Sequence, residues 1–167
     1  SLRSPLHRAA PLGHLEATQA LMELKASLDL ISSPESGQPA GTAGTALLCA
    51  AVEGHATVVE LLAAAKANPS IPDAEHTSPL LHATINRDVT TVEVLCKFMP
   101  DPNVENNIRL RPLMRSVQDG SNEMCELLLQ SHPSVDACED DGLTALFWAC
   151  HRICPILNEE SEQQTAS

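Results

Sequence analysis

Residues 45–62 read TALLCAAVEGHATVVELL. Thirty-three positions further on, residues 78–95 read SPLLHATINRDVTTVEVL, and after another thirty-three, residues 111–128 read RPLMRSVQDGSNEMCELL. One more period brings TALFWAC at residues 144–150. Upstream, residues 4–21 read SPLHRAAPLGHLEATQAL, one period plus eight residues earlier than the first copy quoted. Self-similarity at a fixed period of this length indicates a solenoid built from stacked units.

Each copy has the pattern of two short helices joined by a turn. The hydroxyl of Thr45 can cap a helix start. Three other copies place proline in the following slot, where a missing N–H has no intrahelical partner. Val58, Leu61 and Leu62 then follow the i, i+3, i+4 spacing of one buried helical stripe. No copy can bury its stripe alone, so stacked neighbours are expected to share one continuous core.

This pattern resembles the ankyrin repeat, whose unit is a hairpin loop, a Thr-Pro-Leu-His turn and two antiparallel helices. The resemblance covers residues 4 to about 154 and implies an all-α solenoid of helix–loop–helix units joined by hairpin loops. We expect about four full repeats plus a partial fifth, within one domain over residues 1–157. The expected boundaries are 4–31, 45–77, 78–110, 111–143 and, for the partial repeat, 144–157, with a Ser-, Gly- and Pro-rich insertion at 32–44 and an acidic polar tail at 158–167.

Departures from the family pattern predict local changes. The turn histidine is kept only in His7, and the slot is expected to become apolar packing at Leu48, Leu81, Met114 and Phe147. Arg87 and Asp88 replace the Gly-His pair that ends the first helix elsewhere. Because that glycine usually adopts a left-handed conformation, we expect a strained or reshaped turn in this repeat. His14 and His55, in the slot after the turn glycine, are expected to make structural hydrogen bonds.

Charge and composition exclude several function classes. The 167 residues carry Lys+Arg 10 against Asp+Glu 22, a net charge of −12, so we expect no nucleic-acid partner. Seven residues, 46–52, form the longest apolar run, which excludes membrane insertion by one helix. The chain begins at Ser1 without a charged or apolar leader, so we expect no signal peptide. A cut from a longer array is favoured over natural caps, and a monomer is expected.

The six cysteines do not form a disulfide or zinc framework. Their spacings are wide and irregular, and no Asn-x-Ser/Thr sequon is present once Asn68 is excluded for its following proline. Cys150 and Cys154 form the one close pair, but no second ligand pair follows. We therefore expect no metal, no cofactor and six reduced thiols, which places the protein in the cytoplasm or nucleus.

No catalytic constellation is visible. The sequence lacks a Gly-x-Ser-x-Gly elbow, a phosphate-binding glycine loop and a His-Glu-x-x-His motif. The protein is therefore expected not to be an enzyme. The resemblance instead implies a protein–protein interaction module that binds a protein or peptide through its concave face and hairpin tips. The alternative is the recognition arm of a larger multidomain protein, such as a ubiquitin-ligase adaptor, a kinase or a channel.

The register of the repeats selects the candidate binding residues. They are Arg8, His82, Ile85, Ile108, Arg109, Leu110, Arg111, Arg115, Asp140, Asp141, Leu143, Trp148 and Arg152. Trp148, the single tryptophan, either anchors a partner or covers the exposed end of the stack. Arg109, Arg111 and Arg115 form a basic spot that could clamp an acidic peptide. The alternative is an internal ion pair of these arginines with Glu105, Asp119 or the acidic tip at 139–141.

One residue is a candidate for modification. Asn103 occupies the hairpin slot where many ankyrin arrays carry asparagine, with Leu95 eight residues upstream. The resemblance implies that Asn103 is a possible substrate of an asparaginyl hydroxylase. The alternative is a structural turn residue, which is favoured because asparagine side chains commonly stabilise turns.

Overall fold

The computed structural model describes residues 4–32, 43–99, 101–104, 106–107, 109–138 and 142–151. Within these ranges the regular elements are α1 (Pro5–Ala9), the 3-10 helix η1 (Ala10–Leu12), α2 (Leu15–Glu23), α3 (Ala46–Val52), α4 (Ala56–Ala64), α5 (Pro79–Ile85), α6 (Val89–Phe98), α7 (Pro112–Asp119) and α8 (Asn122–Gln130). Residues 145–151 are also helical. Most of the predicted insertion (33–42) and the whole predicted tail (158–167) lie outside the described residues.

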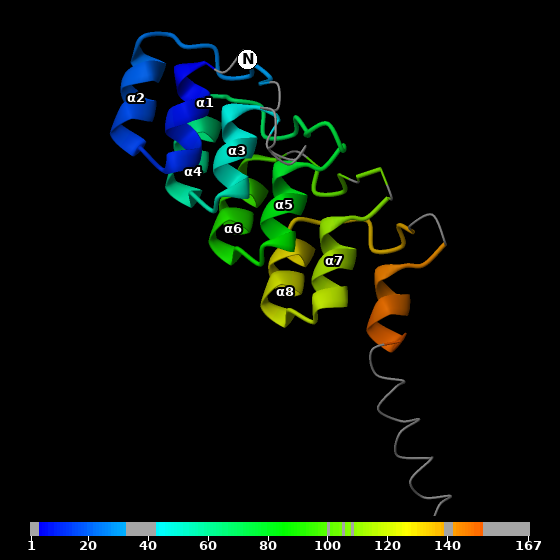
Figure 1. Ribbon diagram of the computed structural model, residues 1–167. Helices are drawn as coiled ribbons and strands as arrows, with labels where there is room; N and C mark the ends of the chain where they lie inside the picture. Colours follow the sequence, from blue (N-terminus) through cyan, green and yellow to red (C-terminus); the bar gives the residue numbers. More distant parts are fainter. Residues whose placement is uncertain are drawn as a thin grey trace, which may run out of the picture.

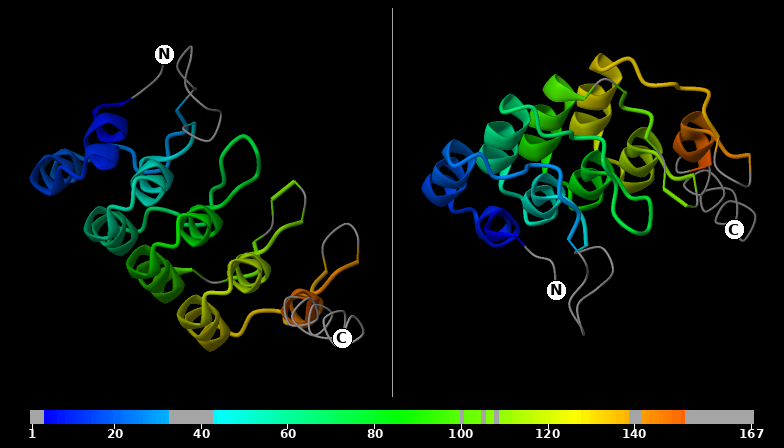
Figure 2. Two further views of the ribbon diagram at one scale, coloured as in Figure 1. Left: turned by 60° about the horizontal axis from the view of Figure 1, so that its bottom comes forward. Right: turned by 90° about the horizontal axis from the view of Figure 1, so that it is seen from above.

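The helices form two parallel rows (Figure 1). One row contains α1, α3, α5, α7 and residues 145–151, and the other contains α2, α4, α6 and α8; Figure 2 shows both rows nearly end-on. Each helix packs on its partner in the same unit and on its neighbour along the row. The long loops extend from the first row, which we call the helix-one row (Figure 2). The described helices form an all-α solenoid of helix–loop–helix units, as the sequence predicts.

Hydroxyl groups cap the N-termini of α3 and α5 in the helix-one row, as the sequence predicts for Thr45. Thr45 Oγ1 accepts a hydrogen bond from Leu48 N at 3.2 Å, and Ser78 Oγ accepts one from Leu81 N at 3.1 Å. Ser4 does not cap α1, because its hydroxyl lies 2.8 Å from His7 Nδ1.

The His7 ring instead ties the first unit to the segment that follows α2. Its Nε2 lies 2.9 Å from Leu30 O and 3.1 Å from Gly44 O. Because carbonyls only accept, Nε2 carries the proton and Nδ1 accepts from the Ser4 hydroxyl.

The residues that replace the turn histidine are buried in the middle of the array, but the last of them is exposed. Leu48 and Leu81 are 0% exposed and Met114 is 2% exposed, which confirms the predicted apolar packing. Phe147, at the equivalent position of residues 145–151, is 45% exposed. The prediction is wrong for Phe147 because no further unit follows it within the described part of the chain.

The turn at Arg87 confirms the expected strain. Arg87 has φ +58°, whereas glycine occupies the equivalent left-handed position at Gly13, Gly54 and Gly120. A side chain in this conformation costs about 1–2 kcal/mol relative to glycine. The next residue, Asp88, caps α6 by accepting a hydrogen bond from Thr91 N at 3.1 Å. This cap offsets part of the strain.

The histidine after the turn glycine has a structural role in one unit and not in the other. His55 Nε2 donates to Pro11 O of the preceding unit at 3.0 Å, as expected. A Cβ on Gly13 would lie only 2.8 Å from the His55 ring. Neither histidine caps its own helix, and no equivalent bond of His14 is seen among the described residues, in which no unit precedes the first. The prediction therefore holds for His55 and is wrong for His14.

One residue that the register placed on the surface is buried. Leu110, expected at an exposed hairpin tip, is 7% exposed and belongs to the core. In the described ranges, no helix has the length and apolar character needed to cross a membrane.

Candidate protein-binding surface

The predicted binding residues lie along the helix-one row and do not form one cluster. Arg8 on α1 and Trp148 in residues 145–151 lie at opposite ends of the array (Figure 1). Ile85 and Leu143 are partly exposed at positions between these ends. Four further predicted residues lie outside the described residues: Ile108, Asp140, Asp141 and Arg152.

A buried carboxylate connects His82 to the hairpin before α5. Asp73 Oδ1 accepts hydrogen bonds from Glu75 N and Thr77 N, both at 2.8 Å. The other carboxylate oxygen, Oδ2, lies 2.8 Å from His82 Nε2. The Asp73 side chain is 0% exposed and the His82 side chain 18% exposed. This network fixes the hairpin against α5 and leaves the tip residues Ala74 and Glu75 exposed.

Two arginines from successive units share the carboxylate of Asp119. Arg115 Nε donates to Asp119 Oδ2 at 3.0 Å, and Arg87 Nη2 lies 3.4 Å from Asp119 Oδ1. The side chains are 33%, 13% and 63% exposed for Arg115, Asp119 and Arg87. Within the described part of the chain, neither guanidinium has another partner. One carboxylate therefore faces two cations, which leaves a local excess of positive charge.

Arg111 and Arg109 lie at the start of α7 and in the turn before it. Arg111 Nη1 donates to Cys138 O at 2.9 Å, which connects the start of α7 to the next loop. Arg109 is exposed and adopts φ +55° in a turn that its N–H closes on Asn106 O at 2.9 Å. The internal alternative with Asp119 is observed for Arg115. The other predicted acidic partners, Glu105 and residues 139–141, lie outside the described residues.

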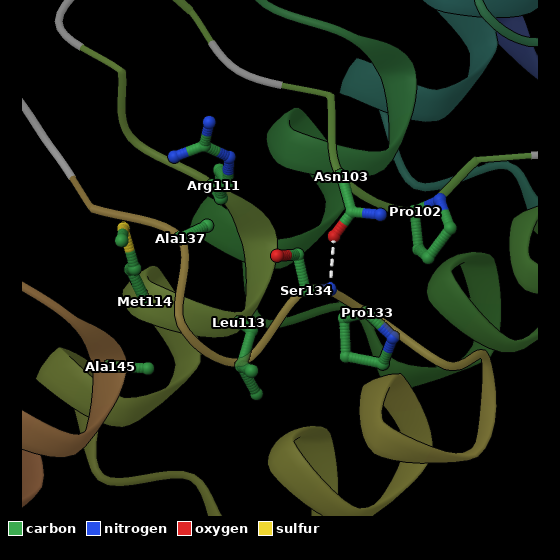
Figure 3. A pocket seen from close by; sticks show the side chains of 9 residues that line it. All are labelled: Pro102, Asn103, Arg111, Leu113, Met114, Pro133, Ser134, Ala137 and Ala145. Carbon is green, nitrogen blue, oxygen red and sulfur yellow. Dashed lines mark hydrogen bonds between the residues drawn. The ribbon is translucent and has the colours of Figure 1, made fainter.

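Asn103 bridges two successive loops (Figure 3). Its Nδ2 donates to Asp101 Oδ1 at 2.8 Å, and its Oδ1 accepts from Ser134 N in the following loop. The crevice beside it has a volume of about 10 Å³, which is about the room one water molecule needs. Both ends of the amide therefore have structural roles, and hydroxylation of Asn103 stays a prediction.

An aromatic group ends the helix-one row. The Trp148 ring is edge-on to Phe147 at 6.2 Å and to His151 at 6.1 Å between ring centroids. Trp148 is half-buried, whereas Phe147 and His151 are exposed. At the opposite end, Arg8 borders an apolar groove between α1 and α2 that Leu12 and Ala17 also line.

The described residues contain no metal-like cluster of histidine, cysteine and carboxylate groups. Burial raises the pKa of the Cys96 thiol, and a hydrogen bond with Ser131 opposes part of this shift. A raised thiol pKa lowers nucleophilicity at neutral pH.

Arg87 is a surface residue that the repeat pattern does not single out. The pattern identifies it only as a substitute for the turn glycine, and its pairing with Asp119 of the next unit depends on how the units stack. The signal in the sequence was the position of Arg87 in the turn between two helices. A side chain at this turn is exposed, as the 63% exposed side chain of Arg87 shows.

A family model of ankyrin repeats, in three copies, matches residues 6–106. This is more than half of the chain, so the protein belongs to the ankyrin repeat family. Ankyrin repeats are generally protein–protein interaction modules and are typically not enzymes. Among curated proteins, none matches the chain significantly.

Proposed function

We propose that the protein is a non-enzymatic binding module that holds an acidic peptide segment of a protein partner against Arg87 and Arg115. The observation that carries this proposal is the sharing of Asp119 by the two arginines. Each guanidinium keeps N–H donors beyond its contact with Asp119, and such donors bind carboxylates in a bidentate manner.

The surroundings of Arg87 and Arg115 favour selective recognition of an acidic segment. The chain as a whole carries a net charge of −12, so acidic peptides are repelled from most of the protein. Binding at Arg87 and Arg115 therefore requires a short acidic segment that reaches the helix-one row. The exposed hairpin tip at Ala74 and Glu75 would contact residues flanking that segment.

The experiment is a selection from a displayed peptide library, followed by affinity measurement. We expect the wild type to enrich peptides with adjacent Asp or Glu residues. The Arg87→Gln/Arg115→Gln variant should bind these peptides about ten-fold or more weakly, because hydrogen bonds to charged groups are lost. Circular dichroism verifies that both proteins are folded.

The matched control is Lys25→Gln/Lys66→Gln, which changes the net charge by the same amount at exposed sites outside the helix-one helices. This control should retain the wild-type affinity. Equal losses in both variants would contradict the proposal by showing a non-specific charge effect, and so would a wild-type selection without acidic enrichment.

The proposal also includes a cellular setting. The five cysteines that the structure describes are all free thiols, which supports a reducing compartment, the cytoplasm or nucleus. We further propose that the protein acts as a monomer on this surface, because a single helix-one row presents both arginines.

A further inference from the structure

A groove that is open to solvent lies between α6 and α8, inside the array. These helices are neighbours in the helix-two row, which consists of α2, α4, α6 and α8 (Figure 1). The groove has a volume of about 260 Å³ and is lined by Glu93, Cys96, Lys97, Leu127, Gln130 and Ser131. Pockets for small molecules usually measure roughly 300–1,000 Å³, so this groove suits one side chain of a larger partner better than a whole ligand.

The preceding unit has a larger side chain at one edge of this groove. Ser131 directly follows α8, and one period earlier Phe98 is the last residue of α6. The hydroxyl group of Ser131 hydrogen-bonds with Cys96. Because a serine stands where the preceding unit has a phenylalanine, the volume of an aromatic ring is missing beside Cys96.

The same comparison shows a cation that the last unit lacks. Lys97 Nζ lies 3.0 Å from Glu93 Oε1. The pKa of Lys97 is raised by its hydrogen bond with Glu93, by the charge of Glu93 and, more weakly, by the charge of Glu60 on α4. Glu126 on α8 is the equivalent of these two glutamates, but Gln130 stands one period after Lys97. Among the described residues, Glu126 has no ion-pair partner.

We propose that the groove between α6 and α8 binds a basic segment of a partner protein. An apolar side chain of the segment enters the groove against Cys96 and Leu127. An adjacent lysine or arginine pairs with Glu126 and so supplies the missing cation. The net charge of −12 favours the approach of such a segment. This surface lies on the helix-two row and is distinct from the acidic-peptide site proposed above.

The 167 residues themselves do not contain a suitable segment. The residues outside the described ranges contain two basic residues, Arg3 and Arg152, and three glutamates follow Arg152 within residues 152–167. A second copy of the chain carries the same negative charge and is repelled.

A further ankyrin unit would not cover the groove either. Along the helix-two row, α6 packs on α4, and α8 packs on α6. The next helix of such a row would therefore pack on the side of α8 that faces away from α6. The groove between α6 and α8 would stay open, so its occupant is a segment that approaches from solvent.

The probe is a blocked heptapeptide with phenylalanine at its centre, two lysines on each side and a glycine at each end. We expect saturable binding to the full chain in titration calorimetry. Bound peptide should slow the alkylation of Cys96 by iodoacetamide, because its ring covers the thiol. Alkylation of Cys138, which is exposed in another loop, should continue at the same rate and serves as the internal control.

Two variants of the protein copy the preceding unit and should therefore melt as the wild type does. Ser131→Phe fills the groove and should weaken binding about ten-fold or more, because the ring of the peptide is no longer buried. Gln130→Lys supplies the cation from α8 itself and should weaken binding about two- to five-fold, as for an exposed ion pair. The matched control is Gln19→Lys, which adds the same charge at an exposed site on α2 and should bind as the wild type does.

A variant of the peptide tests the apolar contact. Serine in place of the phenylalanine should weaken binding to the wild type about ten-fold. The same change should make little difference to binding by Ser131→Phe, because the ring and the groove act as one interaction. This pattern would place the ring of the peptide in the groove.

Five results would overturn the proposal. The first three are no saturable binding to the wild type, unchanged alkylation of Cys96 in the bound state, and an undiminished affinity of Ser131→Phe. The fourth is an equal loss in Gln130→Lys and Gln19→Lys, which would show a general effect of charge. The fifth is a wild-type dimer in sedimentation that Ser131→Phe dissociates, which would show that a second copy occupies the groove.

Discussion

Helix α3 and the helix at residues 145–151 occupy equivalent places in the repeat and have the same start, but they have different surroundings. Residues 45–51 read TALLCAA and residues 144–150 read TALFWAC. Thr45 Oγ1 accepts from Leu48 N at 3.2 Å, and Thr144 Oγ1 accepts from Phe147 N at 3.2 Å. The local sequence therefore specifies the same capped helix at both places.

The difference lies in what covers each helix. Leu47 is 0% exposed between neighbours on both sides, whereas the equivalent Leu146 is 70% exposed. In a solenoid, each unit contacts only its neighbours, so burial and stability depend on position in the stack. The comparison shows that the repeat pattern predicts the helix, while the neighbouring units determine how much free energy of folding the helix contributes.

The largest expected effect comes from truncating the two equivalent leucines. Leu47→Ala should lower the free energy of unfolding by about 2–5 kcal/mol, because it leaves a cavity in a packed core. Leu146→Ala should change it by less than about 0.5 kcal/mol, because the side chain is already in solvent. Urea denaturation followed by circular dichroism measures both values. Equal losses would show that the end of the array is as tightly packed as its middle.

Two glycines extend the comparison to the turns. Gly13 and Gly142 have φ +70° and +76°, but only Gly13 has a close neighbour, the His55 ring. Gly13→Ala should cost about 2–4 kcal/mol from conformation and overpacking together. Gly142→Ala should cost only about 1–2 kcal/mol from conformation. Thermal melts of both variants give the order, and a larger loss at Gly142 would contradict the described contact.

Arg87→Gly should stabilise the protein by up to about 1 kcal/mol, because glycine relieves the left-handed conformation while an exposed ion pair is lost. The same variant should bind acidic peptides more weakly. Lys66→Gly is the control, because Lys66 has φ +71° and is exposed. It should stabilise the protein without weakening binding. Loss of stability in Arg87→Gly would show that the pair with Asp119 outweighs the strain.

The smallest effect concerns thiol reactivity. Cys138 is exposed, whereas Cys96 is partly buried and its pKa is raised by that burial. At pH 8, a raised pKa leaves less thiolate, so iodoacetamide should modify Cys96 more slowly than Cys138. Peptide mass spectrometry after timed alkylation measures both rates. Faster modification of Cys96 would contradict the described packing of α6.

The fold could be predicted from sequence because it depends on spacing. The 33-residue period places the caps at Thr45 and Ser78, and the missing glycine at Arg87 predicts the strained turn. The surface could be predicted only in part. Leu110 is buried by the way its hairpin folds back, and Arg87 meets Asp119 through the stacking of two units. Neither loop geometry nor contacts between units follow from a period within one unit.

Neighbouring units, rather than local sequence, set the stability of each helix. Hydrogen–deuterium exchange tests this dependence, because protection reports local opening free energies. We predict that backbone amides of α3 exchange at least about 100-fold more slowly than those of residues 145–151, despite the same cap and the same place in the repeat. Equal protection of the two helices in the isolated protein would contradict the account.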